Sequence, residues 1–346
     1  MKAVVYKGNG KVALEERPVP ELTDEKDALV KVTLTTICSS DIHIKHGAVP
    51  RAVPGVILGH EFVGEVVAVG SAVKKVKPGD RVSVNVETFC GECFFCRRGF
   101  VNNCTDENGG WALGCRIDGG QAEYVRIPYA DNGLTVIPEN VTDEQALFNG
   151  DILSTGYWAA KLGEIQPADT VAVIGAGPTG LCTMLSARLY TPANIIAVDT
   201  DEYRLDVAKA RGLADITLVP GRDDVEGEIR KATGGRGADA VFEVAGGKET
   251  FQTAWKIARP NAVVVIVAMY EEPQMLPLPE MYGKNLTFKT GGVDGSYCQE
   301  IMDLTARGKL DAGFLITHRC TLGDIMEAYD IFENKKEHVI KYAVKP

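Results

Sequence analysis

The chain has 346 residues, which is more than one hydrophobic core usually supports, so two domains are expected. Its net charge of −10 argues against nucleic acid as a partner, because a phosphate backbone is bound by basic surfaces. The N-terminal segment turns polar too early for a signal peptide, and no stretch approaches the roughly 20 apolar residues that span a membrane. We therefore expect a cytoplasmic protein with no membrane partner.

Residues 1–151 have the character of a β-rich domain. Short runs rich in valine, each ended by turn residues, are typical of strands, and they span residues 28–38, 61–70, 80–86 and 122–128. Pro78-Gly79 predicts a turn between two of these strands. The pattern favours a partly open barrel.

Residues 152–294 alternate between short apolar runs and helical patterns. The expected strands are 170–177, 194–199, 215–219, 238–244, 261–269 and 286–292. Helices are expected at 178–190, at 202–212, over a charged stretch ending at Thr233, and at 249–258. This alternation predicts right-handed βαβ units and an α/β fold with a doubly wound parallel sheet of the Rossmann type.

The remaining segment, 295–346, has two helical patterns at 298–310 and 322–335 and a strand-like end at 338–346. It follows the sixth strand of a complete dinucleotide fold, so we expect it to return to the first domain. The predicted domains are therefore 1–151 with 295–346, and 152–294.

A glycine-rich motif follows the first strand of the second domain. Gly175, Gly177 and Gly180, with Pro178 and Thr179 between the last two, form G-x-G-x-x-G at the start of a helix. The motif alone is a weak signal, but in a βαβ unit its glycines allow a tight turn and the approach of a pyrophosphate to the helix N-terminus.

Asp199 ends the second strand of that unit. A carboxylate there accepts hydrogen bonds from the adenosine ribose and repels a 2′-phosphate, so NAD(H) is favoured over NADP(H). The alternative is that Asp199 only caps the helix that starts near Glu202.

Four of the nine cysteines lie close together in the sequence, as C-x2-C-x2-C-x7-C. They are Cys90, Cys93, Cys96 and Cys104. Four thiolates close the tetrahedral shell of zinc and leave no position for substrate, so a structural zinc is expected, with an iron–sulfur cluster as the alternative. The other cysteines outside the metal motifs, Cys115, Cys182, Cys298 and Cys320, stand alone and are expected to be packed or inert.

A second metal site is indicated by two polar motifs in the β-rich domain. Cys38, Ser40, Asp41 and His43 come just after the expected strand at 30–37, and Gly59-His60-Glu61 comes about twenty residues later. A cysteine and a histidine in separate Gly/Pro-flanked segments, each beside a carboxylate, are typical of a metal site.

Taken together, these motifs resemble the zinc-dependent alcohol dehydrogenases of the medium-chain dehydrogenase/reductase superfamily over essentially the whole chain. The motifs occur in the same order as in the family: C-x-S-D-x-H, GHE-x2-G-x-V, the four-cysteine lobe, STG, GxGxxG and the strand-end Asp. The resemblance implies a GroES-like catalytic domain joined to the Rossmann domain.

The resemblance also implies roles for single residues. Cys38 and His60 match the first two ligands of the catalytic zinc, and Asp151, just before the STG tripeptide, matches the third. Many relatives have cysteine at this third position. Aspartate is similar to the branch that contains microbial secondary-alcohol and formaldehyde-dehydrogenase-like enzymes.

Around these ligands, Glu61 matches a carboxylate that can approach the zinc, and Asp41 matches the residue that orients the ligand histidine. Ser40 and His43 match a relay that removes the alcohol proton, whereas His46 matches no motif position. In the second domain, Thr155 matches a residue near the nicotinamide. Arg204 matches one near the adenosine ribose or phosphate, with a solvated helix residue as the alternative.

The implied function is zinc-dependent, reversible hydride transfer between a primary or secondary alcohol and NAD, with two Zn²⁺ per chain, one catalytic and one structural. Alternatives are a polyol dehydrogenase, disfavoured because such relatives usually carry Glu at the third ligand position, and a zinc-stabilised NAD-binding regulator without turnover. The partners implied are a small alcohol, aldehyde or ketone and further copies of the chain, as a tetramer or dimer. Trp111, Tyr157 and Trp158 are candidates to contact substrate, although lone aromatic residues more often belong to a core.

Overall fold

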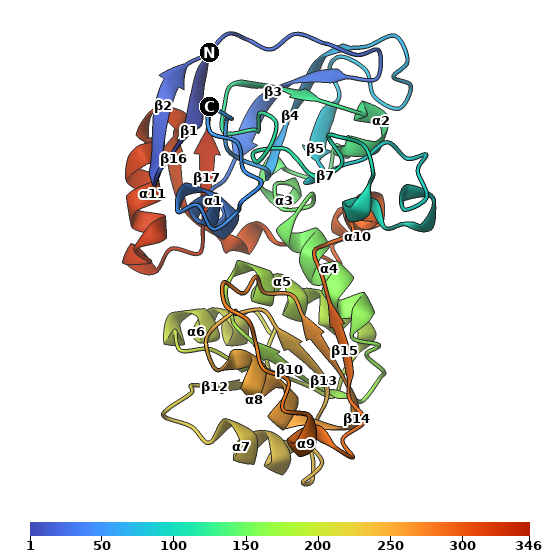
Figure 1. Ribbon diagram of the computed structural model, residues 1–346, viewed down its shortest axis with the longest axis vertical. Coiled ribbons are helices and arrows are strands. Elements are labelled where there is room, and N and C mark those ends of the chain that lie inside the picture. Colours follow the sequence, from blue (N-terminus) through green and yellow to red (C-terminus); the bar gives the residue numbers. More distant parts are fainter. The chain divides into compact units, whose positions relative to one another are not determined.

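The computed structural model describes all 346 residues. The chain forms two compact units, of which the first contains Met1–Ser154 and Asp294–Pro346 and the second contains Thr155–Val293 (Figure 1). The C-terminal segment thus rejoins the β-rich part of the chain. None of the helices combines the length and the apolar character needed to cross a bilayer.

A seven-stranded sheet is the centre of the first unit. Its order is β16-β17-β3-β4-β5-β9, with β8 also paired to β3 along Ala28–Lys31. The bounds are β3 Ala28–Thr35, β4 Phe62–Val69, β5 Arg81–Val84, β8 Tyr124–Ile127, β9 Leu134–Val136, β16 Ile316–Thr321 and β17 Lys341–Lys345. β-branched residues at alternate positions of β3, such as Val30 and Val32, turn into an apolar core shared with Phe62 and Val82.

Shorter elements surround this sheet. Two further pairs of strands are antiparallel. One is the hairpin of β1 Lys2–Gly8 and β2 Lys11–Glu16, and the other pairs β6 Glu87–Thr88 with β7 Gly110–Trp111. The helices of this unit are α1 Ser39–Lys45, α2 Ala130–Gly133, α3 Asp143–Ala146, α10 Cys298–Ala306 and α11 Ile325–Glu333. Helix α4, Ile152–Leu162, contains the boundary between the units.

The second unit is built on a six-stranded parallel sheet of order β12-β11-β10-β13-β14-β15. The bounds of the strands are β10 Thr170–Ile174, β11 Asn194–Val198, β12 Ile216–Leu218, β13 Ala238–Glu243, β14 Ala258–Ile266 and β15 Thr287–Thr290. Strand order reverses beside β10, and in doubly wound sheets the dinucleotide binds at the carboxyl ends of the strands at such a point. Both this topology and the α/β class confirm the prediction.

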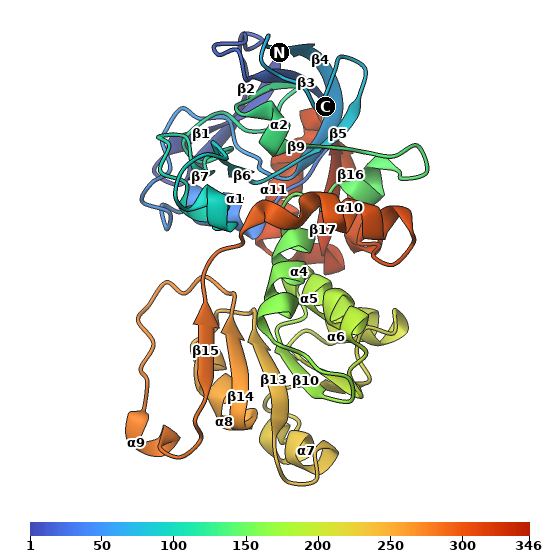
Figure 2. The same ribbon diagram turned by 90° about the vertical axis from the view of Figure 1, so that its right-hand side faces the viewer.

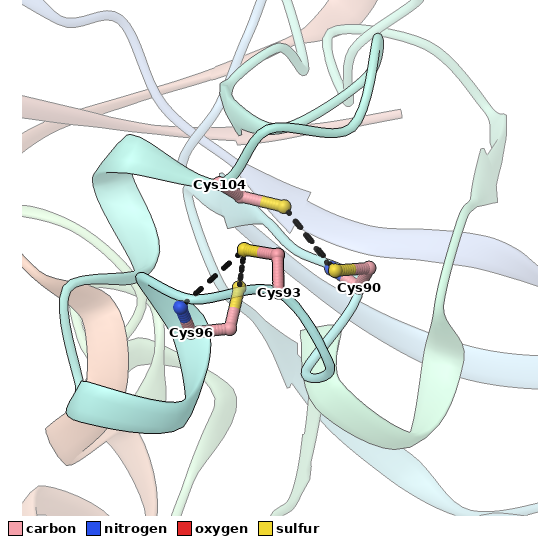
Figure 3. Close-up of side chains that lie close together, drawn as sticks. All are labelled: Cys90, Cys93, Cys96 and Cys104. Carbon is pink, nitrogen blue, oxygen red and sulfur yellow. Dashed lines mark hydrogen bonds between the residues drawn. The ribbon is translucent and has the colours of Figure 1, made fainter.

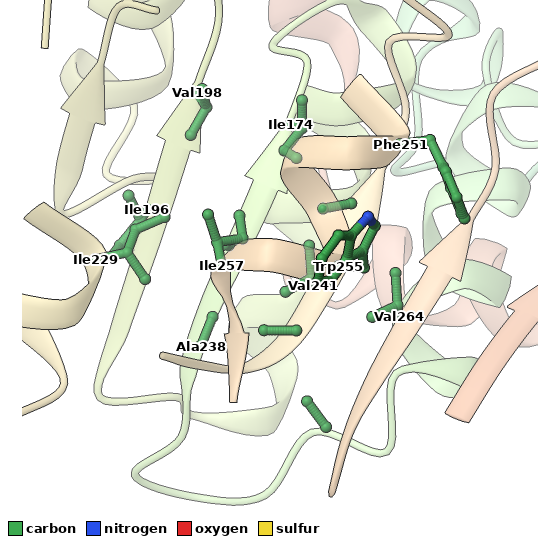
Figure 4. Packing of buried hydrophobic residues seen from close by; sticks show 14 of the residues in the cluster. Ile174, Ile196, Val198, Ile229, Ala238, Val241, Phe251, Trp255, Ile257 and Val264 are labelled. Atoms are coloured by element: carbon green, nitrogen blue, oxygen red, sulfur yellow. The ribbon is translucent and has the colours of Figure 1, made fainter. Parts of the chain in front are cut away.

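Helices cover both faces of this sheet (Figure 2). They are α5 Pro178–Ala187, α6 Glu202–Ala210, α7 Val225–Ala232, α8 Thr250–Ile257 and the short α9 Leu278–Met281. Figure 4 shows Ile229 of α7 and Trp255 of α8 in one buried cluster with Ile174, Ile196 and Val241 of the sheet. Because both faces are covered, β10 is buried at every position and reads as a continuous apolar run.

Most expected elements are present, with two additions and some shifted ends. The hairpin of β1 and β2 was not among the predicted strands, although Gly8, Asn9 and Gly10 all have positive φ, as a tight turn requires. Strand β16 was also missed, because ITHRCT is too polar to stand out as a strand. Strand β14 begins at Ala258, whereas the apolar run suggested Asn261.

Gly150, the residue before the expected ligand Asp151, packs against the end of β5. The amide of Val86, just beyond β5, donates to the Gly150 carbonyl at 3.0 Å. A Cβ at Gly150 would lie 1.7 Å from the carbonyl oxygen of Val84. Any side chain here must therefore push the segment that carries Asp151 away from β5.

We predict that Gly150→Ala lowers stability by about 1–3 kcal/mol, because it overpacks this contact. The melting temperature of the two proteins measures the effect. Gly323→Ala is the control, since a Cβ there meets only Thr321 Oγ1 at an ordinary 3.4 Å. Equal melting temperatures for Gly150→Ala and the wild type would contradict the prediction.

Candidate functional site

Four side chains that can bind a metal converge in the first unit. The donor atoms of Cys38, His60, Glu61 and Asp151 all lie within 4.8 Å of one another. Cys38 ends the segment after β3 and is the N-cap of α1, His60 and Glu61 directly precede β4, and Asp151 directly precedes α4. The structure thus brings together the three expected ligands and Glu61. We call these four residues the donor cluster.

The imidazole of His60 is held with its two nitrogens facing different partners. Its Nε2 lies 3.3 Å from Asp151 Oδ2, and its Nδ1 lies 3.5 Å from Asp41 Oδ1. The Nε2 atom therefore faces the donor cluster, while Asp41 faces the far side of the ring. This is the arrangement by which an outer carboxylate fixes the ring of a metal-binding histidine.

Asp41 is itself fixed by two buried hydrogen bonds. The backbone amide of Cys38 donates to its Oδ2 at 2.8 Å, and Gln121 Nε2 donates to the same oxygen at 3.0 Å. Gln121 in turn accepts a hydrogen bond of 2.7 Å from the hydroxyl of Tyr329. The orientation of His60 is thus controlled by residues from α1, from the loop before β8 and from α11.

The surroundings of His60 favour positive charge. Burial alone would lower the pKa of its imidazole, but the carboxylates of Asp41 and Asp151 outweigh burial and raise this pKa well above its usual value. The same negative groups that favour a proton at this position also favour a metal cation. The site is built to hold positive charge among buried ligands.

Glu61 forms a buried ion pair with Lys341 of β17. Lys341 Nζ also donates to the carbonyl of Ile37 at 3.2 Å. Burial would lower the pKa of this lysine, but the negative charge of Cys38 and Glu61 outweighs it and raises the pKa. Lys341 therefore stays charged and holds Glu61 at the edge of the donor cluster.

Helix α1 carries the two residues of the expected proton relay. Ser40 Oγ lies 3.7 Å from Cys38 Sγ, so the hydroxyl is beside the donor cluster. His43 lies three residues further along the helix, on the same face, and is half-buried. His46, which matched no motif, is exposed, and its ring contacts Glu333 of α11.

The donor cluster fits zinc. One thiolate, one imidazole nitrogen and carboxylate oxygens are all ligands that zinc accepts. Cys38, His60 and Asp151 would supply three ligands and leave a fourth for substrate or water, as in catalytic zinc sites, and the Glu61 carboxylate lies in the same cluster.

The four-cysteine lobe places its sulfurs in a second group. The Sγ atoms of Cys90, Cys93, Cys96 and Cys104 lie within 4.8 Å of one another (Figure 3). None of the nine cysteines is in a disulfide. With four sulfurs and no oxygen or nitrogen donor, the group fits a closed metal shell.

Backbone amides of the lobe point at these sulfurs, which is how a loop stabilises thiolates. The amide of Cys96 donates to Cys93 Sγ, and together with Thr105 it lowers the pKa of the Cys93 thiol to about 5. Burial has the opposite effect on Cys96, whose pKa is raised, with the neighbouring Cys93 adding to the shift. Neighbouring thiolates repel one another unless a cation lies between them.

Of the four lone cysteines, Cys115, Cys182 and Cys298 are buried and Cys320 is half-buried. Burial raises the pKa of Cys115, Cys298 and Cys320, so their thiols are kept neutral. A neutral thiol is a poor nucleophile, which agrees with the expectation for these three residues.

In the second unit the glycine motif forms a close turn between β10 and α5. A Cβ at Gly180 would lie 1.9 Å from the carbonyl oxygen of Gly175, and Gly175 itself has a φ of +105°. Pro178 is at the first turn of α5, and no side chain caps that N-terminus, so its amides can face a phosphate. Thr179 lies in the same turn, half-buried.

Asp199 lies beside this turn. Its Oδ2 accepts the amide of Ala176 at 2.5 Å and its Oδ1 accepts that of Asp201 at 2.8 Å. The N-cap of α6 is Asp201, not Asp199, so capping is not the role of Asp199.

Arg204 Nη1 is 3.5 Å from where a Gly177 Cβ would be, which places the guanidinium over the glycine turn. Thr155 is the first residue of this unit and lies in α4.

Gln121, Tyr329 and Lys341 belong to the surroundings of the donor cluster but were not expected there. Each is buried, and none lies in a motif. In the sequence, Lys341 is distinguished only by being a lysine within a strand-like segment near the end of the chain. Nothing in its spacing indicates that it contacts Glu61.

Two family models match the chain. Residues 24–139 match the alcohol dehydrogenase GroES-like domain, and residues 178–307 match the zinc-binding dehydrogenase domain. An alcohol dehydrogenase from Cupriavidus necator is 36% identical, with 100% of this chain and 99% of that protein covered. The chain belongs to the zinc-dependent alcohol dehydrogenases of the medium-chain superfamily.

Two further relatives are informative. The solved structure of alcohol dehydrogenase TADH from Thermus sp. ATN1 is 36% identical, with a TM-score of 0.92 over 100% of this chain and 99% of that one. The NADP-dependent isopropanol dehydrogenase of Thermoanaerobacter brockii is 33% identical, with 99% of each chain covered. The expected family, the GroES-like and Rossmann fold, and the class of zinc-dependent alcohol oxidoreductase with a nicotinamide cofactor are therefore confirmed.

We predict that Lys341→Met destabilises the enzyme by about 3–5 kcal/mol, because Glu61 is left buried and charged without its partner. The double variant Lys341→Met/Glu61→Gln should recover much of this loss, since the uncompensated charge is gone. Denaturant unfolding of the wild type and both variants measures the difference. If the single variant is as stable as the wild type, the ion pair does not have this role.

Proposed function

We propose that this dehydrogenase holds two Zn²⁺ per chain and oxidises primary or secondary alcohols with NAD, reversibly. The observation that carries the proposal is the donor cluster, in which Cys38, His60 and Asp151 surround one point with mixed sulfur, nitrogen and oxygen donors. Such a set binds zinc with three protein ligands and leaves one position for a substrate oxygen. The aspartate at the third ligand position supports our proposal that the chain is related to the branch with microbial secondary-alcohol dehydrogenases.

When bound, zinc supplies a Lewis acid that lowers the pKa of the alcohol oxygen, and nicotinamide supplies the hydride acceptor. Ser40 lies beside Cys38 and accepts the alcohol proton through its hydroxyl. His43, on the same face of α1, passes that proton to water. Asp41 holds His60 in the orientation that keeps Nε2 toward the site. Glu61, paired with Lys341, would stand beside the zinc as a carboxylate that can approach it.

The four-cysteine lobe has a different task. Its four thiolates complete the coordination of a second zinc, so this ion stabilises the loop and takes no part in turnover. The structural elements η1 Cys96–Arg98 and η2 Val101–Asn103 are short 3-10 turns, and the loop has little other regular structure to define it.

NAD is proposed as the cofactor because Asp199 directly follows β11 and lies beside the glycine turn. Its carboxylate can accept ribose hydroxyls in addition to the two backbone amides, whereas a 2′-phosphate would be repelled. Arg204 and Thr155 are proposed to contact the adenosine half and the nicotinamide half, respectively. We further propose a homo-oligomer, because the exposed apolar residues Met275, Leu278 and Tyr282 lie close together in the sequence before edge strand β15.

We predict two zinc ions per chain by elemental analysis, and one in each of Cys38→Ser and Cys96→Ser. Turnover of a short alcohol with NAD should be lost in Cys38→Ser while NADH still binds, because the cofactor site is in the second unit. Cys96→Ser is the matched control, since it should lower thermal stability through the lobe. An undiminished rate in Cys38→Ser, or a wild type that binds zinc and NADH but oxidises no alcohol, would contradict the proposal.

We predict that Asp199→Ala weakens NADH binding by about 1.5–3 kcal/mol, the worth of hydrogen bonds to a charged group, and weakens NADPH binding far less. Fluorescence titration of both cofactors against wild type and variant measures the selectivity. A wild type that already binds NADPH more tightly would show that the cofactor is assigned wrongly.

A further inference from the structure

Tyr329 of helix α11 places a hydroxyl group in the interior of the first unit. Its side chain is among the largest that are buried in the chain, with 2% exposed. The hydroxyl donates to Gln121 Oε1 at 2.7 Å, and Gln121 is itself fully buried. The two residues are 208 positions apart in the sequence, so this hydrogen bond connects the C-terminal segment to the loop before β8.

The side-chain amide of Gln121 is held in one direction. Its Nε2 donates to the carbonyl of Thr36 and to Asp41 Oδ2, both at 3.0 Å. A side-chain amide has two N–H donors, so both are used here, and its oxygen is left for the hydroxyl of Tyr329. If the amide turned over, its oxygen would face two other acceptors. The hydroxyl therefore favours the orientation in which the amide nitrogen faces Asp41.

Asp41 passes this constraint on to the metal-binding histidine. Its Oδ2 accepts from Gln121 and, at 2.8 Å, from the backbone amide of Cys38. Its Oδ1 lies 3.5 Å from His60 Nδ1, and neither of these buried atoms has another hydrogen-bond partner in the chain. Each is therefore available only to the other. Tyr329, Gln121, Asp41 and His60 form a continuous series of contacts, which we call the orienting chain.

The orienting chain is shielded from water along its whole length. Gln121 and Asp41 are fully buried, and His60 is only 1% exposed. Water cannot replace a lost hydrogen bond at such positions, so removal of a donor leaves its acceptor unpaired. Burial raises the pKa of Tyr329 well above its ordinary value, and the negative charges of Asp41 and Cys38 add to the shift. The hydroxyl thus stays neutral and keeps the proton that it donates to Gln121.

Helix α11 has other contacts that hold it in the first unit. Ile325 and Ala328 of this helix are buried, and Glu333, one turn after Tyr329, pairs with Lys45 of α1. Figure 1 and Figure 2 show α11, in the red of the C-terminal segment, beside the blue α1. Removal of the hydroxyl alone therefore leaves the helix packed and changes only the hydrogen bond to Gln121.

We propose that Tyr329 is a positioning residue that sets the zinc affinity of the donor cluster, acting through Gln121 and Asp41 on the ring of His60. The proposal rests on the catalytic zinc proposed above. Without the hydroxyl, Gln121 Oε1 is buried and unpaired in the amide orientation that serves Asp41, and this orientation loses stability. Asp41 then holds the imidazole less firmly in the direction that presents Nε2 to the metal. Outer partners of a metal-binding histidine contribute about 10–100-fold to metal affinity.

Competition for zinc with a chelator tests the proposal on two sites of one molecule. The wild type should give two dissociation constants for zinc, and the one that is missing in Cys38→Ser belongs to the donor cluster. In Tyr329→Phe we expect this constant to rise about 10-fold, at the lower end for an outer partner because Tyr329 acts through two other residues. The constant of the four-cysteine lobe should stay unchanged, since none of its ligands belongs to the orienting chain.

Tyr6→Phe is the matched control, because Tyr6 is another buried tyrosine of the first unit and takes no part in the orienting chain. Both of its zinc constants should equal those of the wild type.

The variants Gln121→Leu and Tyr329→Phe/Gln121→Leu test the route. If Tyr329 acts through Gln121, the double variant should bind zinc no more weakly than Gln121→Leu alone, because the effects of residues in one network do not add. If Gln121→Leu does not fold, the comparison of Tyr329→Phe with Tyr6→Phe decides.

Three results would overturn the inference. They are an unchanged donor-cluster constant in a folded Tyr329→Phe, a rise of both zinc constants by the same factor, and a double variant whose loss equals the product of the two single losses. Any of these in a protein that binds two zinc ions removes the inference and leaves the proposed function intact. A wild type that binds zinc only in the four-cysteine lobe removes both.

Discussion

The first unit of this protein is organised around a cluster of buried groups that need a cation. Cys38, Glu61 and Asp151 can each carry negative charge, and together with His60 they place their donor atoms within 4.8 Å of one another. Like charges so close in a medium of low dielectric repel strongly. A divalent metal resolves the repulsion among the ligands, and Lys341 resolves it for Glu61. Much of the local sequence serves to keep these groups together.

Keeping them together requires segments that are far apart in the chain. Asp41 orients His60, Gln121 holds Asp41, and Tyr329 holds Gln121. Glu61 is paired with Lys341 of the last strand. The return of residues 294–346 to the first unit is therefore a condition for the site as well as for the sheet. The four-cysteine lobe is a contrast, since all its donors come from one loop and its four sulfurs leave no position for substrate.

The sequence alone allowed the candidate ligands to be predicted. Cys38 and His60 lie in short motifs with a chemical logic, and Asp151 was found from its position in the family pattern. The glycine turn, the strand-end Asp199 and the parallel sheet could be read from local patterns of period and punctuation. Lys341, Gln121 and Tyr329 could not, because their contacts depend on tertiary structure across hundreds of residues, and no spacing reports them. The polar strand β16 was missed for a related reason, since its place at the sheet edge lets it stay half-exposed.

The burial of Glu87 was equally invisible in the sequence, where it stands as an ordinary charged residue ahead of the cysteine lobe. In the structure it is buried with Trp111 against His60. Trp111, one of the three aromatic residues named as candidates to contact substrate, packs against the imidazole of His60.

The most direct test of this account is anomalous diffraction at the zinc edge from crystals of the zinc-loaded enzyme. We expect two peaks per chain, one among the sulfurs of Cys90, Cys93, Cys96 and Cys104 and one bounded by Cys38 Sγ, His60 Nε2 and a carboxylate oxygen of Asp151. A single peak, or a second peak that Asp151 does not contact, would contradict the assignment of an open three-ligand site.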